Sequence, residues 1–181
     1  MPTESKWATR FVWVAIFQGG LSALLSVFLL LGEINVLPVR VSLLITTTIP
    51  GIWIALGYVA YVIIGTVGMA VTALFYHYLE VNLKRSYRGN NQLLAWLHLI
   101  LGNVGIAGTS WLIMYVGYIT AIATLPKSFG GAGLPVEQAE GLMVGGFLIP
   151  ITLFAGVTIL GLFLGGVGYV LVYRTRTRRS S

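Results

Sequence analysis

Four long apolar stretches, separated by short polar segments, constrain this chain more than any other feature of its sequence. They lie at about residues 11–32, 51–80, 93–124 and 142–173, and each is long enough to cross the ~30 Å hydrocarbon core of a bilayer as a helix. Hydrophobic residues make up 57% of the chain and charged residues only 9%, a balance that does not suit the surface of a water-soluble domain. The sequence therefore predicts an all-α integral membrane bundle of about four transmembrane helices, with residues 1–181 forming a single domain.

Two segments of the sequence are each compatible with two structures. Residues 36–50 contain Pro38, Arg40 and Pro50, which favours an interfacial segment leading into the second helix over a fifth crossing. The first apolar run follows Lys6 and Arg10 as a signal peptide would, but it is about 21 residues long and has no small-x-small cleavage site. We expect it to be retained as the first helix.

Basic residues gather on one side of this four-helix arrangement. Only Arg40 and Lys127 fall on the other side, against Lys6, Arg10, Lys84, Arg85, Arg88, Arg174, Arg176, Arg178 and Arg179. The positive-inside rule then places both termini in the cytoplasm, with the protein in the plasma membrane. We expect the basic tail at residues 174–181 to meet anionic lipids, and not nucleic acid, because its charges adjoin a membrane helix.

Small and amide side chains in the apolar stretches indicate helix packing. Glycines recur at spacings that place them on one helix face, which lets membrane helices approach closely; they are Gly141, Gly145, Gly161, Gly165 and Gly168. Asn103 lies deep in the third stretch, where its amide must pair across a helix interface because no water is available. We interpret all six residues as packing residues.

The main ionisable residues of the apolar stretches are His77, His98 and Glu80. In an antiparallel hairpin the two histidines should lie at similar depth, so they could ligate a b-type haem, or join Glu80 around a metal ion. The alternative is a polar collar at the headgroups formed by His77 and Glu80, with His98 hydrogen-bonded inside the bundle. The sequence has no cysteine, which excludes thiolate metal sites, and no aspartate, which argues against a proton pump. No catalytic residue is predicted.

From about residue 52 onward, the order of features resembles the last three helices of the large subunit of haem–copper oxidases. Residues 65–79, which contain His77, are similar to the family helix that carries haem-ligand histidines, and residues 94–105, which contain His98, resemble the opening of the next family helix. Residues 57–62, where the family places its paired haem ligands, contain no histidine. The resemblance thus implies a shortened relative without the haem and copper ligands.

These observations lead to a ranked set of functions. The first is an accessory, non-catalytic subunit of a multi-subunit membrane redox complex, such as a respiratory terminal oxidase, with other membrane subunits as partners and no cofactor of its own. The second is a small b-type cytochrome or quinone-interacting electron carrier that uses His77 and His98. The third is an accessory subunit of a membrane monooxygenase. A transporter or channel ranks last, because the sequence lacks internal repeats and buried charges.

Overall fold

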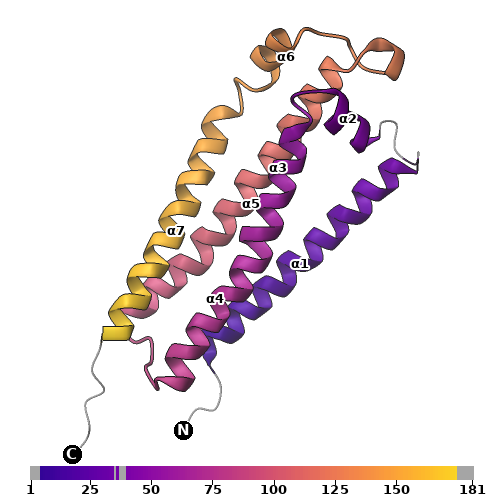
Figure 1. Ribbon diagram of the computed structural model, residues 1–181. Coiled ribbons are helices and arrows are strands. Elements are labelled where there is room, and N and C mark those ends of the chain that lie inside the picture. Colours follow the sequence, from indigo (N-terminus) through magenta and orange to yellow (C-terminus); the bar gives the residue numbers. More distant parts are fainter. Residues whose placement is uncertain (1–4, 35, 37–39, 175–181) are drawn as a thin grey trace, which may run out of the picture.

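The chain folds into a helical bundle in which four helices are long and apolar enough to cross a membrane (Figure 1). The computed structural model describes residues 5–34, 36 and 40–174, and the regular structure of this part is helical, without strands. The four spans are α1 (Lys6–Glu33), the continuous path Ile52–Asn82, α5 (Asn90–Thr124) and α7 (Leu148–Arg174). The prediction of four membrane-length helices is therefore confirmed.

The second span is one helical path with changes of winding. It consists of α3 (Ile52–Ala60), the π-helical segment η1 (Tyr61–Val67), α4 (Gly68–His77) and the π-helical segment η2 (Tyr78–Asn82). A π-helical turn closes its hydrogen bonds one residue further along the chain than an α-helical turn does. The two segments therefore alter which side chains of this span face its neighbours.

Three short helices connect the spans. They are α2 (Val41–Thr47), the single turn η3 (Lys127–Phe129) and α6 (Val136–Met143). At 1.5 Å per residue, the seven residues of α2 extend only about 10 Å, too little to cross a bilayer. Among the residues that are described, the segment from 36 to 50 therefore contains no helix of spanning length. The predicted interfacial segment includes residues 37–39, which lie outside the described residues, as does most of the predicted basic tail, at 175–181.

The fourth span begins later than the sequence suggested. The expected helix over 142–173 is divided, because residues 144–147 form turns between α6 and α7. Gly145 and Gly146 lie in these turns, and glycine lowers helix stability because its backbone loses the most freedom on folding. Gly141 and Gly145 consequently do not belong to the membrane-length helix α7.

The helices pack side by side, and at one end of the bundle all four spans lie close together. α7 packs along α5, α5 along α3, and α1 along α4 and η1, an order that can be followed in Figure 1. The starts of α1 and α5 and the ends of η2 and α7 lie together at the same end of the bundle. We call it the closed end. At the opposite end α1 diverges from α5 (Figure 1). A groove of about 290 Å³ lies there between Phe28 of α1 and Trp111 of α5.

Close helix approach explains why α5 and α7 pack along so much of their length. A Cβ atom added at Gly105 would lie 2.5 Å from the Thr158 backbone nitrogen, and one added at Gly161 would collide with the Gly102 backbone. Any side chain at these glycines would force the two helices apart. The small residues thus allow backbone-to-backbone packing, which takes the place of the hydrophobic effect inside a bilayer.

Candidate functional site

Buried rings gather at the closed end of the bundle. Trp7 and Phe11 come from α1, Tyr76 from α4, Tyr87 from the loop that precedes α5, and His98 from α5; all five are buried. The ring centroids of Phe11 and Tyr76 lie 4.7 Å apart, and those of Tyr76 and Tyr87 lie 4.9 Å apart. We refer to these five residues as the aromatic cluster. Offset and tilted rings at such distances stabilise one another beyond their burial.

His98 is enclosed within the aromatic cluster and is only 6% exposed. Its Nδ1 lies 3.3 Å from the Tyr76 hydroxyl oxygen, and the Phe11 ring centroid lies 5.1 Å from that of the imidazole. On the remaining side the imidazole lies against the backbone of α7 at Gly165, where an added Cβ would collide with it. The ring thus contacts three helices, which enclose it.

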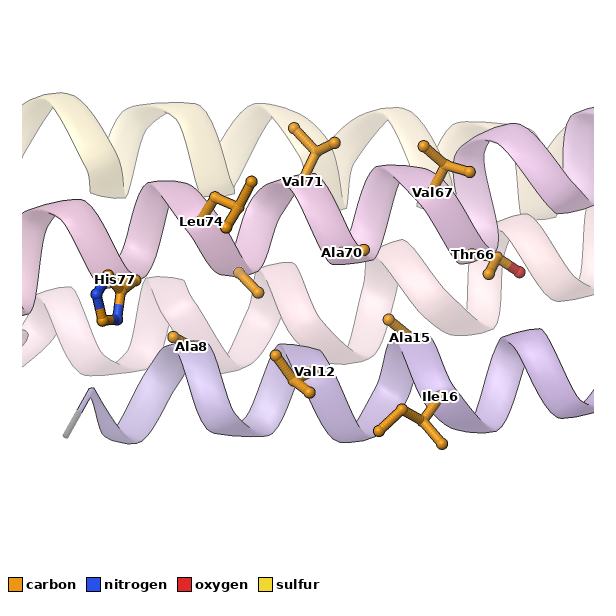
Figure 2. A pocket seen from close by; sticks show the side chains of 11 residues that line it. Ala8, Val12, Ala15, Ile16, Thr66, Val67, Ala70, Val71, Leu74 and His77 are labelled. Carbon is orange, nitrogen blue, oxygen red and sulfur yellow. The ribbon is translucent and has the colours of Figure 1, made fainter.

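His77 points in a different direction. It is exposed and lines a groove of about 580 Å³ between α1 and α4, together with small and aliphatic residues such as Ala8 and Val12. Figure 2 shows its imidazole at one end of this groove. Successive residues of a helix point about 100° apart, so Tyr76 reaches His98 while His77 turns away from it. The two imidazoles do not face a common space.

Glu80 also points to a partner other than the histidines. Its Oε2 accepts a hydrogen bond from the Trp7 backbone nitrogen at 3.2 Å and another from the Ser5 hydroxyl. In the described part of the chain, no three His, Cys, Asp or Glu side chains are grouped so that they could hold a metal ion. The described structure therefore does not bring His77, His98 and Glu80 together in one group.

Burial also determines the protonation state of Tyr87, which lies outside the membrane-length helices. Tyr87 is 6% exposed, and this burial raises the pKa of its phenol far above the usual range. The neighbouring Tyr76 and the Glu80 carboxylate act in the same direction. Tyr87 thus contributes a neutral ring to the aromatic cluster.

Asn103 pairs across a helix interface. Its Oδ1 accepts a hydrogen bond of 3.1 Å from Gln18 Nε2 of α1, and its Nδ2 donates to the Leu99 carbonyl one turn earlier in α5. Further from the closed end, the Ser22 and Thr66 hydroxyls lie 3.1 Å apart. These contacts connect α1 to α5 and to η1 through polar groups in the apolar part of the bundle.

The predicted packing glycines fall into two groups. Gly161, Gly165 and Gly168 are buried on the face of α7 that meets α5, near Gly102, His98 and Leu94 respectively. Gly141 and Gly145 are exposed, and a Cβ atom added at Gly141 would meet nothing within 4 Å. Close packing inside this chain therefore involves the first group only.

Sequence reasoning missed two features of the site. One is a pair of hydroxyls on α1, Ser22 and Ser26, on the same face as Gln18; Ser26 pairs with the Tyr58 hydroxyl at 2.7 Å. Its signal was present, because residues four apart share a helix face. The other is a basic pocket at the closed end, missed because the sequence does not show that residues such as Lys6, Arg10 and Arg88 share one concave surface.

The geometry of the closed end allows binding and packing. The His98 imidazole of α5 contacts α1, α4 and α7. The basic pocket beside the aromatic cluster is lined by polar and cationic side chains. A comparison with protein families, with curated proteins and with solved structures finds no match to this chain.

Proposed function

We propose that this chain is an accessory, non-catalytic subunit of a multi-subunit membrane redox complex, such as a respiratory terminal oxidase. In this proposal it lies in the plasma membrane with both termini in the cytoplasm, and its helices dock against larger subunits that carry the redox centres. It would be a shortened relative of the haem–copper oxidase large subunit, because residues 65–79 and 94–105 resemble that family while residues 57–62 lack its histidines.

The outer face of α7 is the observation that carries this proposal. Gly156 and Gly166 are exposed on this helix, and a Cβ atom added at either would meet nothing within 4 Å. Beside Gly166, the side chains of Phe163 and Val170 border a shallow apolar hollow of about 470 Å³. Outward glycines in a membrane helix permit another helix to approach its backbone. This face remains available for a partner helix, since Gly161 and Gly165 already pack against α5.

The uncovered sides of the outer helices support the same reading. Each span contains an apolar stretch of 18 residues. Only 11% of the stretch in α1 and 17% of the stretch in α7 is buried, compared with 39% of the stretch in α5. Lipid can cover such surfaces, and so can other membrane subunits. α1 and α7 are therefore the helices with most surface available for docking.

The placement of the ionisable residues supports a non-catalytic role. His98 is held among Phe11, Tyr76 and Gly165, and Glu80 is bonded to the start of α1. Both residues thus serve the packing of this chain. In the proposed complex the redox chemistry belongs to the partner subunits.

Purification from the native membrane in mild detergent, followed by mass spectrometry of the co-purifying proteins, tests this function. We expect oxidase subunits in stoichiometric amounts. Recovery with monooxygenase subunits would instead support the accessory role in that other complex. Recovery of the chain alone, or only with copies of itself, would contradict the accessory role.

A pair of glycine variants tests the docking face. Gly166→Leu fills the hollow on α7, so we expect it to lower the recovery of partner subunits, by roughly tenfold if about 1.4 kcal/mol of packing is lost. Gly141→Leu is the matched control, because Gly141 is also exposed with nothing within 4 Å of its added Cβ, but lies on α6, outside the membrane-length helices. Unchanged recovery with Gly166→Leu would contradict docking through α7.

A further inference from the structure

A polar pocket of about 570 Å³ lies at the closed end of the bundle, next to the aromatic cluster. The start of α1, the end of η2, the loop at residues 83–89 and the first turn of α5 form its walls. We call it the basic pocket, and its lining residues are Lys6, Trp7, Arg10, Glu80, Val81, Lys84, Arg85, Ser86, Tyr87, Arg88 and Gln92. Residues far apart in the sequence thus combine to form one concave surface.

The charge of the basic pocket is strongly unbalanced. Among the described residues that line it, five are Lys or Arg and one, Glu80, carries a carboxylate. That carboxylate already accepts hydrogen bonds from the Ser5 hydroxyl and the Trp7 backbone nitrogen. A concave surface with an excess of one charge raises the local concentration of the opposite ion. The pocket is therefore suited to an anion.

Two of the cations are held in fixed positions. The Arg10 guanidinium lies 4.5 Å from the ring centroid of Trp7 and 4.6 Å from that of Trp96, so two indole rings hold it by cation–π contacts. Arg85 donates a hydrogen bond to the Val172 carbonyl at 3.5 Å. Fixed donors lose less conformational entropy when they bind a ligand than mobile ones do. The basic pocket is thus partly organised before any ligand arrives.

The loop that carries three of the cations has an unusual backbone. Lys84 has a φ of +52°, in the left-handed region that residues other than glycine rarely adopt, and Gly89 at the other end has a φ of +56°. Strained backbone of this kind occurs often at ligand-binding sites. Here it curls the loop, so that Lys84, Arg85 and Arg88 all line the same pocket.

We propose that the basic pocket binds the phosphate group of an anionic membrane lipid. The pocket lies where membrane-length helices begin and end, and the indoles of Trp7 and Trp96 beside it are typical of the headgroup region. Lysine and arginine are the side chains that recognise phosphate oxygens in proteins. The lining residues named above precede the predicted basic tail in the sequence, and the proposal does not depend on which subunits surround the chain.

Lipid retention by the full-length protein tests the proposal. The protein is purified in mild detergent, exchanged into nanodiscs of phosphatidylcholine with phosphatidylglycerol, and its bound lipids are counted by native mass spectrometry. We expect phosphatidylglycerol to be retained over phosphatidylcholine. Replacing two cations of the pocket, in Lys6→Gln with Arg88→Gln, should lower phosphatidylglycerol retention by roughly tenfold or more, at about 1 kcal/mol for each charge.

Two further variants make the result specific. The control Lys127→Gln removes a cation from η3, at the opposite end of the bundle, and should leave retention unchanged. The charge-conserving pair Lys6→Arg with Arg88→Lys should restore binding, which a general loss of folding would not allow. Equal retention in the double Gln variant and the unaltered protein would overturn the proposal, as would an equal loss in the control.

Inorganic phosphate distinguishes the source of the anion. If millimolar phosphate displaces phosphatidylglycerol from the unaltered protein, the basic pocket recognises the phosphate group itself, whether free or in a lipid. If the lipid stays bound but is lost from the double Gln variant, the glycerol and acyl parts contribute as well. Phosphate binding that is unchanged in the double Gln variant, with no lipid retained, would overturn the proposal.

Discussion

Neighbouring glycines on α7 have different roles because they face different directions. Gly165 is buried against the His98 imidazole, and Gly166 faces outward with nothing near its missing side chain. The two glycines are equally apolar, but only Gly165 determines how closely α7 approaches α5. A substitution at Gly165 should therefore change the stability of the chain, and a substitution at Gly166 should change its association with partner subunits.

The change Gly165→Ala tests this difference. The added methyl group would collide with the His98 ring, so we expect the free energy of unfolding to fall by about 1–3 kcal/mol, as overpacking usually causes. Thermal unfolding in detergent, followed by circular dichroism, measures the change. The control Gly166→Ala should leave the midpoint unchanged or slightly higher, and equal midpoints for the two variants would show that His98 moves aside freely.

The pair of Gln18 and Asn103 has a similar role between α1 and α5. Asn103→Leu would leave the Gln18 amide without the acceptor that lies 3.1 Å from its Nε2, which should lower stability by about 0.5–2 kcal/mol. A double-mutant cycle with Gln18→Leu isolates the contact, because the double variant loses both polar groups. Strictly additive effects of the two single changes would contradict a direct interaction.

At the scale of elements, the start of α1 depends on a residue from another span. Ser5 caps the helix by accepting a hydrogen bond from the Ala8 nitrogen at 3.0 Å, and Glu80 accepts from the Trp7 nitrogen at 3.2 Å. An anionic oxygen is favourable at a helix N-terminus, where amide groups have no partner within the helix. The first turn of α1 is thereby attached to η2.

Glu80→Ala should loosen this attachment. We expect the amides of Trp7 and Ala8 to exchange with deuterium about five- to thirtyfold faster, since about 1–2 kcal/mol of charged hydrogen bonding is lost. Hydrogen–deuterium exchange with mass spectrometry resolves the peptide that contains them. Glu137→Ala in α6 is the control, and protection at Trp7 that is unchanged in Glu80→Ala would contradict the role of the carboxylate.

The helices were predictable from hydropathy, but some of their ends were not. Four membrane-length helices follow from four apolar stretches, because length and apolar character are local properties of the chain. The break before Leu148 was missed, since Gly145 and Gly146 interrupt a helix without lowering hydropathy much. The π-helical segment η1 at Tyr61–Val67 was not predicted either, because its winding depends on packing against other spans.

The candidate site was less predictable than the fold. The sequence indicated that His77 and His98 lie at similar depth, but the direction of each side chain depends on the rotation of its helix, which contacts with α1 and α7 determine. Tyr76, one residue earlier, faces His98 instead. The basic pocket was hidden for a related reason, because it combines residues from segments that are distant in the sequence.

At the scale of the whole molecule, the described helices place the loop containing Ser86 and the loop containing Ser128 at opposite ends of the bundle. Both serines are exposed. In a membrane these loops should face opposite compartments, and the positive-inside rule predicts that the basic side near Ser86 faces the cytoplasm.

Single cysteines test this topology with little background, because the sequence contains no native cysteine. We expect Ser128→Cys to react with a membrane-impermeant maleimide in intact cells, and Ser86→Cys to react only after the cells are permeabilised. Gel-shift labelling measures both. Labelling of Ser86→Cys alone in intact cells would reverse the proposed orientation, and labelling of both would contradict a crossing of the membrane by α5 between these loops.

The pairing of α5 with α7 also has a consequence for biosynthesis. α7 is the last of the described helices to leave the ribosome, and yet it packs along most of α5, through contacts such as Gly105 with Thr158 and Gly165 with His98. Until α7 is inserted, the glycine face of α5 and one side of the His98 ring have no protein partner. Assembly of this bundle is thus completed late, and a chain whose synthesis stopped before Leu148 would expose one side of the His98 imidazole to lipid.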